Sequence, residues 1–113
     1  MPQSEKATYR VWLKPDVHKG REQLPGHIRQ RVKRAIHNLG TEPRPSKSRI
    51  LRLTGEFHNE PEWELRRIRL ESWRIVYAIN ANWQEVAILS IRQRPPYNYE
   101  DLESLLSDLI KFD

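Results

Sequence analysis

Glu64-Leu-Arg-Arg-Ile-Arg-Leu70 and Trp73-Arg-Ile-Val-Tyr-Ala-Ile79 are two segments separated only by Glu71-Ser72, a spacing that favours an antiparallel hairpin. Strand side chains alternate faces with period two, so Arg67 and Arg69 share one face while Ile68 and Leu70 share the other. A sheet that buries one face and lines the other with guanidinium groups is suited to an extended anion. Phosphodiester backbone is the first candidate.

Further strands are predicted on both sides of this hairpin. Glu85-Val-Ala-Ile-Leu-Ser-Ile-Arg-Gln-Arg94 follows the short link Asn80-Ala-Asn82, and Arg49-Ile-Leu-Arg-Leu-Thr54 precedes the hairpin. Six arginines therefore fall between Arg66 and Arg94. By period, Arg66 lies on the opposite, more apolar face, so we interpret it as an edge or structural residue.

The N-terminal part predicts a strand and two helices. Tyr9-Arg-Val-Trp-Leu13 alternates like a short strand that Pro15 ends, and Asp16 can cap a helical segment reaching about Leu24. An apolar stripe then predicts a longer amphipathic helix, with Gly40 at a natural position just past its end. The stripe consists of Ile28, Val32, Ala35, Ile36 and Leu39.

The C-terminal part predicts a last helix that begins near Asn98 or Tyr99 and carries an apolar stripe of Leu102, Leu105, Leu106 and Leu109. The element order is then β-α-α-β-β-β-β-α. This order indicates an α+β fold, in which an N-terminal strand and helical hairpin pack on an antiparallel sheet with a C-terminal helix. We expect residues 1–7 to be a loose leader and residues 8–113 to form a single domain.

The charge of the chain is unevenly distributed. The 113 residues carry a formal net charge of +5, but residues 1–98 hold 19 basic and 10 acidic residues, a balance of +9. Residues 99–113 hold five acids and one base. A basic body favours an anionic partner, although a well-solvated surface needs no partner to have this composition.

The composition also limits the other classes of site. Zero cysteines exclude disulfides and thiolate metal sites and fit a reducing cytoplasm. The four histidines (His18, His27, His37 and His58) lack the spacing of metal ligands, so we expect neither a metal nor another cofactor. No apolar run reaches the roughly 18 residues of a membrane span.

Three motifs follow one another in a recognisable order: Leu53-Thr-Gly55, Arg67-Ile-Arg-Leu-Glu-Ser-Trp-Arg-Ile-Val-Tyr77 and Ile88-Leu-Ser-Ile-Arg-Gln-Arg-Pro-Pro-Tyr97. Their order, spacing and element context resemble the RelE/ParE superfamily of toxins. The resemblance covers roughly residues 8–98, and the preceding strand and helical hairpin also lie where that family places them. The strand from Trp73 to Tyr77, combined with the Arg94 to Tyr97 ending, is its most specific part.

The resemblance implies a toxin of a type II toxin–antitoxin system. RelE-type members are ribosome-dependent mRNA endonucleases, ParE-type members poison DNA gyrase, and an antitoxin encoded beside the toxin neutralises both. A RelE-type chain is expected to hold mRNA in the ribosomal A site on its basic face. Cleavage there uses the neighbouring 2′-hydroxyl as the nucleophile and needs no metal. The implied partners are therefore the antitoxin, the ribosome and mRNA.

The resemblance also implies residue roles, carried over position by position. Arg74 and Arg94 are expected to stabilise the phosphate, and Tyr97 to transfer a proton or stack on a base. Arg67, Arg69, Arg92 and Tyr99 are expected to bind RNA, with Arg67 and Arg69 positioning the message.

This sequence departs from the family pattern in ways that leave the general base unassigned. Some active members carry lysines at the positions of Arg67 and Arg69, and many carry histidine at the position of Arg92. Arginine is a poor general base because its pKa is above about 12. Two alternatives therefore stay open: a ParE-like inhibitor of gyrase that acts through protein contacts, and a noncatalytic RNA- or ribosome-binding module.

Overall fold

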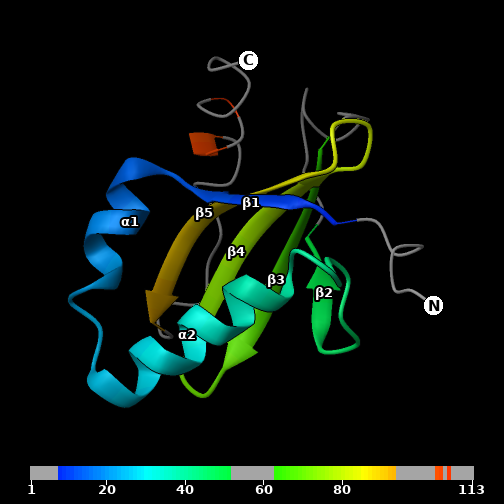
Figure 1. Cartoon of the computed structure of the whole chain (residues 1–113). Coiled ribbons are helices and arrows are strands. Elements are labelled where there is room, and N and C mark those ends of the chain that lie inside the picture. The colour runs from blue at the N-terminus through cyan, green and yellow to red at the C-terminus, as the bar shows by residue number, and fades with distance from the viewer. Residues whose placement is uncertain (1–7, 52–62, 94–103, 106, 108–113) are drawn as a thin grey trace.

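The computed structural model describes residues 8–51, 63–93, 104, 105 and 107, and within them a five-stranded sheet carries two helices (Figure 1). The elements are β1 (Arg10–Leu13), α1 (Pro15–Arg21), α2 (Gly26–Asn38), β2 (Ser48–Ile50), β3 (Glu64–Leu70), β4 (Trp73–Asn80) and β5 (Glu85–Gln93). This architecture confirms the predicted α+β class. Among the described residues, neither helix has the length and apolar character that a membrane span requires.

The strands lie in the order β1-β5-β4-β3-β2. The pairs β2–β3, β3–β4 and β4–β5 are antiparallel, and for the last two the short connections predict this. β1 differs, because it pairs with β5 in parallel, with Leu13 opposite Ile88. A parallel partner needs a long connection, and here the two helices and β2 to β4 supply it.

Both faces of the sheet are covered by apolar side chains. α1 and α2 lie on one face, here called the helix face, where Ile28, Val32 and Leu39 pack with Ile68, Ile75 and Tyr77 of the strands. On the opposite face a second, smaller cluster forms around Trp63, Leu65, Val76, Ala78, Ala87 and Leu89. β4 is consequently buried along nearly its whole length, whereas the sequence pattern predicted one buried face only.

A β-bulge changes the phase of β5. Val76 is opposite Ser90 and Tyr77 is opposite Ile88, so Leu89 is an extra residue between the two pairs. Ile88 packs on the helix face, and strict alternation from it would place Ile91 on the opposite face. The bulge instead returns Ile91 to the helix-face cluster, and therefore places Arg92 on the opposite face.

One local prediction at the helix ends needs correction, and another is confirmed in its position. The residue at the N-terminal cap of α1 is Lys14, with Pro15 as the first helical residue and Asp16 inside the first turn. Proline fits this position because the first helical residues need no backbone N–H donor. Gly40 follows α2 as predicted, but its role is close packing. A Cβ atom there would lie 3.3 Å from the Tyr9 carbonyl oxygen.

Some predictions concern parts of the chain outside the described residues. These are the leader at residues 1–7, the chain from 52 to 62 and the start of the last helix. Of the predicted C-terminal helix, the structure describes Ser104, Leu105 and Ser107. Ser104 and Leu105 are consecutive residues in helical conformation. Leu105 packs against the second cluster, as the apolar stripe predicts.

A polar network fastens the segment before β2 to the sheet. Arg44 and Arg66 both bind the Glu64 carboxylate, at 3.0 and 2.6 Å. Arg66 Nε also donates to Ser48 Oγ at 2.9 Å, and the Tyr77 hydroxyl donates to the Pro43 carbonyl oxygen at 2.8 Å. Arg66 therefore has the structural role that its period indicates, on the helix face of the sheet.

Replacing Tyr77 by phenylalanine tests the link between this network and the core. The hydroxyl is lost while the ring stays, so we expect the free energy of unfolding to fall by about 1 kcal/mol. Burial raises the pKa of Tyr77 above its ordinary 10.0. The contribution of the Tyr77 hydroxyl to the free energy of unfolding is therefore complete below about pH 10. It is lost as the pH rises through the folded-state pKa of Tyr77. Urea unfolding between pH 8 and about pH 11 should show a smaller alkaline loss of stability in Tyr77→Phe. An equal loss in both proteins would contradict this role.

Glu64→Gln tests the ionic part of the network. Partial burial by itself would raise the pKa of Glu64, but the hydrogen bonds from Arg44 and Arg66 bring it below its ordinary 4.5. Because the pKa of Glu64 is lowered in the folded protein, its ionised carboxylate stabilises the fold above about pH 4.5. This stability is lost as the pH falls through the folded-state pKa. We expect Glu64→Gln to destabilise the protein by about 1 kcal/mol at neutral pH and much less near pH 3. The exposed Glu42→Gln is the matched control. A pH-independent difference for Glu64→Gln would exclude this role.

Candidate functional site

The face opposite the helices carries a row of arginines across three strands. Arg69 of β3 is opposite Arg74 of β4, which in turn is opposite Arg92 of β5. A second row runs parallel to it, with Arg49 of β2 opposite Arg67 of β3. The two rows are called the cationic face below. They occupy the end of the sheet near the β3–β4 turn, and the second apolar cluster occupies the other end.

The accessibility of these arginines differs. Arg69 is exposed, and Arg67 and Arg92 are half-buried. Arg92 Nε donates to Ser90 Oγ at 2.9 Å, which orients its guanidinium group along β5. The cross-strand register thus brings together Arg67, Arg69 and Arg92, the described residues for which RNA binding is predicted.

Arg74 has an environment that the sequence did not predict. It is only 3% exposed, although it lies in the same row as the exposed Arg69. Its Nη1 donates to the carbonyl oxygens of Glu71 and Trp73, at 3.3 and 3.1 Å. Arg74 therefore supports the β3–β4 turn, and its charge reaches the cationic face from beneath the surface.

Two further cations belong to the cationic face but were not assigned by sequence reasoning. Lys47 and Arg49 form a pocket of about 290 Å³ together with Arg67 and Arg69. Sequence alternation alone gives the phase of each strand but not which residue is opposite which. The pairing of Arg49 with Arg67 is therefore a consequence of register, which only the folded sheet reveals.

The carboxylates of the described strands and of the β3–β4 turn are paired away from the cationic face. Glu64 binds Arg44 and Arg66 on the helix face, Glu71 binds Arg31 of α2, and Glu85 binds Arg10 of β1. No carboxylate among residues 8–51 and 63–93 is paired with Lys47, Arg49, Arg67 or Arg69. Like charges on adjacent strands destabilise the sheet, so a bound anion would offset their repulsion.

The chemistry available on the described part of this face is anion binding. Guanidinium groups bind phosphate oxygens with several donors and stabilise the charge that builds up when phosphorus is attacked. No histidine or carboxylate of the described chain accompanies them in the two rows. The predicted site residues Arg94, Tyr97 and Tyr99 lie outside the described residues. Within those residues, no group of His, Asp and Glu side chains could hold a metal ion.

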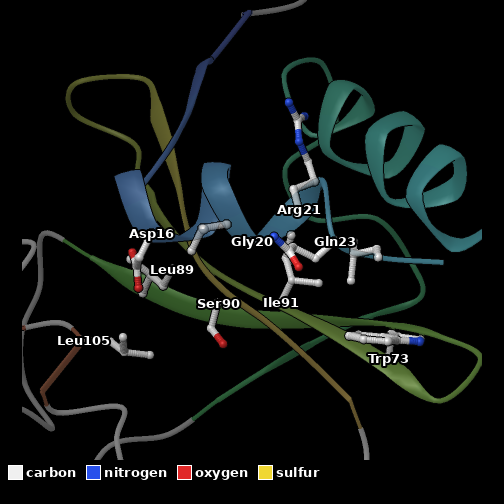
Figure 2. Close-up of a pocket in the computed structure, with 11 residues that line it drawn as sticks. Asp16, Gly20, Arg21, Gln23, Trp73, Leu89, Ser90, Ile91 and Leu105 are labelled. Atoms are coloured by element: carbon white, nitrogen blue, oxygen red, sulfur yellow. The ribbon is translucent and has the colours of Figure 1, made fainter. Parts of the chain in front are cut away.

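A separate pocket of about 390 Å³ lies beside the outer edge of β5 (Figure 2). Because β1 ends opposite Ile88, the next residues of β5 face this pocket rather than a neighbouring strand. Residues of α1 and of the segment after it, together with Trp73 and Leu105, form the remaining described walls, in which Asp16 and Arg21 are the charged residues. Ser90 connects it to the cationic face through its hydrogen bond with Arg92.

Comparison with solved structures identifies the fold. The chain is similar to a structure of the archaeal RelE–RelB complex from Pyrococcus horikoshii, with a TM-score of 0.66 and 28% identity over 78% of this chain and 97% of the other. It is also similar to a structure of the toxin–antitoxin complex RelBE2 from Mycobacterium tuberculosis, with a TM-score of 0.58 and 23% identity over 77% and 99% of the two chains. The isolated RelE toxin of Escherichia coli matches with a TM-score of 0.57 and 17% identity, over 89% of this chain and 98% of the toxin.

Sequence comparison alone does not reach these relatives. No protein-family model and no curated protein matches the chain. The agreement in three dimensions covers 77% to 89% of this chain and nearly the whole length of each related chain. The chain therefore has the fold of the RelE toxins, and its 28% identity with a chain of the archaeal RelE–RelB complex supports a place in the RelE/ParE toxin superfamily.

Proposed function

We propose that the protein is a ribosome-dependent mRNA endonuclease and the toxin of a type II toxin–antitoxin pair. The observation that carries this proposal is the cationic face on a RelE-like fold. Arg69, Arg74 and Arg92 are in one row across three strands, and the carboxylates of the described sheet are engaged elsewhere. Such a surface favours the phosphodiester backbone of an extended, single-stranded message.

The proposed reaction is an internal transesterification of RNA. The 2′-oxygen attacks the adjacent phosphorus, the bond between phosphorus and the 5′-oxygen breaks, and the products are a 2′,3′-cyclic phosphate and a 5′-hydroxyl. A base must accept the 2′-hydroxyl proton and an acid must protonate the 5′-oxygen. Arg74 and Arg94 are proposed to stabilise the phosphoryl charge, and Tyr97 to transfer a proton.

The remaining site residues are proposed to hold the message. Arg67 and Arg69 would position its backbone, while Arg92 and Tyr99 would bind RNA beside the scissile phosphate. We place this activity in the cytoplasm, where ribosomes and mRNA meet. A cognate antitoxin is the proposed protein partner, and it would neutralise the toxin by covering the cationic face or the helical hairpin.

Arg69→Gln provides the cleanest test of the positioning role, because Arg69 is exposed and no carboxylate among the described residues pairs with it. We expect the rate of A-site mRNA cleavage on purified ribosomes to fall by about tenfold to a hundredfold, with the fold intact. The control is Arg34→Gln, which removes the same charge from the exposed surface of α2. Equal rates for both variants and the parent protein would contradict the proposed site.

One observation favours a second candidate, a ParE-like inhibitor of gyrase. Arg74 is buried, and the described rows contain arginines but no histidine or carboxylate that could act as a general base. Catalysis needs such a base, whereas binding to a protein does not. A gyrase supercoiling assay separates the two functions. The nuclease proposal predicts full supercoiling in the presence of the protein. Inhibition of gyrase together with intact A-site mRNA would establish the alternative instead. Salt-dependent RNA binding without either activity would identify a noncatalytic module.

A further inference from the structure

The side of the cationic face at β2 contains two cations, Lys47 and Arg49, that have no role in the proposed function. Among the residues that the structure describes, the pocket there is lined by Lys47, Arg49, Arg67 and Arg69. Arg49 and Arg67 are directly opposite each other on adjacent strands, which places two like charges side by side. An arrangement of this kind costs folding stability in the absence of an anion, because the charges repel.

The β2 end of this pocket is held firmly in place. Arg49 Nη1 donates to the carbonyl oxygens of Ser46 and Ser48, at 3.2 and 3.1 Å, so its guanidinium group has a fixed position. Ser48 is itself buried and accepts a hydrogen bond from Arg66. A preorganised cation binds an anion more tightly because less side-chain freedom is lost on binding.

The pocket is too far from the other end of the cationic face to share its ligand. Adjacent strands are separated by about 4.8 Å, so β2 and β5 are separated by about 14 Å. That span exceeds the size of one phosphate group. Cations at both ends of a sheet of this width therefore fit a chain of phosphates that crosses the strands, not a single free anion.

We propose that Lys47 and Arg49, together with the neighbouring Arg67, form a second phosphate subsite for RNA. This inference rests on the proposed function for the identity of the ligand and adds the path that the ligand takes. The RNA backbone crosses the sheet from β5 to β2, roughly perpendicular to the strands. The scissile phosphate lies near the row of Arg69, Arg74 and Arg92, and a flanking phosphate lies over the pocket at β2.

Binding of a fluorescent oligouridylate to the purified full-length protein tests this subsite without any need for cleavage. Each phosphate contact with single-stranded nucleic acid contributes about 0.7 to the slope of log affinity against log salt concentration. Lys47→Gln and the double variant Lys47→Gln/Arg49→Gln should therefore lower the magnitude of this slope. For the double variant we expect a decrease of about 0.7 and an affinity about fivefold weaker at 0.1 M salt.

Two controls make the test specific. Lys33→Gln/Arg34→Gln removes the same charge from the exposed surface of α2, on the other side of the sheet, and should leave the slope nearly unchanged. A uridine dinucleotide is too short to cross the strands, so its affinity should be the same for the parent protein and the Lys47→Gln/Arg49→Gln variant. Lys47→Gln alone guards against misfolding, because this exposed side chain has no partner among the described residues.

The outcomes separate the subsite from the nuclease proposal. A lower slope for the β2 variants with no mRNA cleavage by the parent protein would support the subsite and reject the nuclease. Cleavage by the parent with unchanged slopes for the β2 variants would overturn the subsite alone. No binding of oligouridylate by the parent protein, or an equal loss in the α2 control, would also overturn it.

Discussion

The register between β3, β4 and β5 is the constraint on which the fold and the site both depend. It pairs Ile68 with Ile75 on the helix face and Arg69 with Arg74 on the opposite face. A slip of one residue in β3 would exchange the two sets, burying the arginines under α2 and exposing the isoleucines. Burial of the helix-face core therefore fixes the position of the cationic face, and the bulge at Leu89 extends that face onto β5 by bringing Arg92 to it.

The distribution of charge follows from the same constraint. On the helix face, Arg44, Glu64 and Arg66 form a compact network that holds the segment before β2 against the sheet. The acids at the strand ends, Glu71 and Glu85, pair with cations of α2 and β1. Glu64, Glu71 and Glu85 thus fix secondary elements to one another. On the opposite face, Lys47, Arg49, Arg67 and Arg69 pair with no carboxylate among the described residues, so their charge can meet a phosphodiester ligand.

Sequence reasoning predicted the elements of this fold because their signals are local. The alternation of apolar and polar residues predicted the hairpin, and the predicted bounds of β3 are those observed. The apolar stripe predicted α2. Features that depend on the pairing of distant residues were not predicted. The parallel partnership of β1, the burial of Arg74 and the pairing of Arg49 with Arg67 all require knowledge of which strands are neighbours. The bulge in β5 does correspond to a feature of the sequence, because the alternation of apolar residues changes phase between Ile88 and Ile91. The roles of Arg94, Tyr97 and Tyr99 stay predictions.

Analysis of the RNA ends left on programmed ribosomes shows directly whether this protein cleaves mRNA through the 2′-hydroxyl. The purified protein is incubated with ribosomes that carry a defined codon in the A site. Parallel controls omit the protein or contain excess chelator, and the mRNA fragments are identified by mass spectrometry. We expect cleavage within the A-site codon that leaves a 2′,3′-cyclic phosphate on one fragment and a 5′-hydroxyl on the other. Intact mRNA, or fragments that end in a 3′-hydroxyl and a 5′-phosphate, would contradict it.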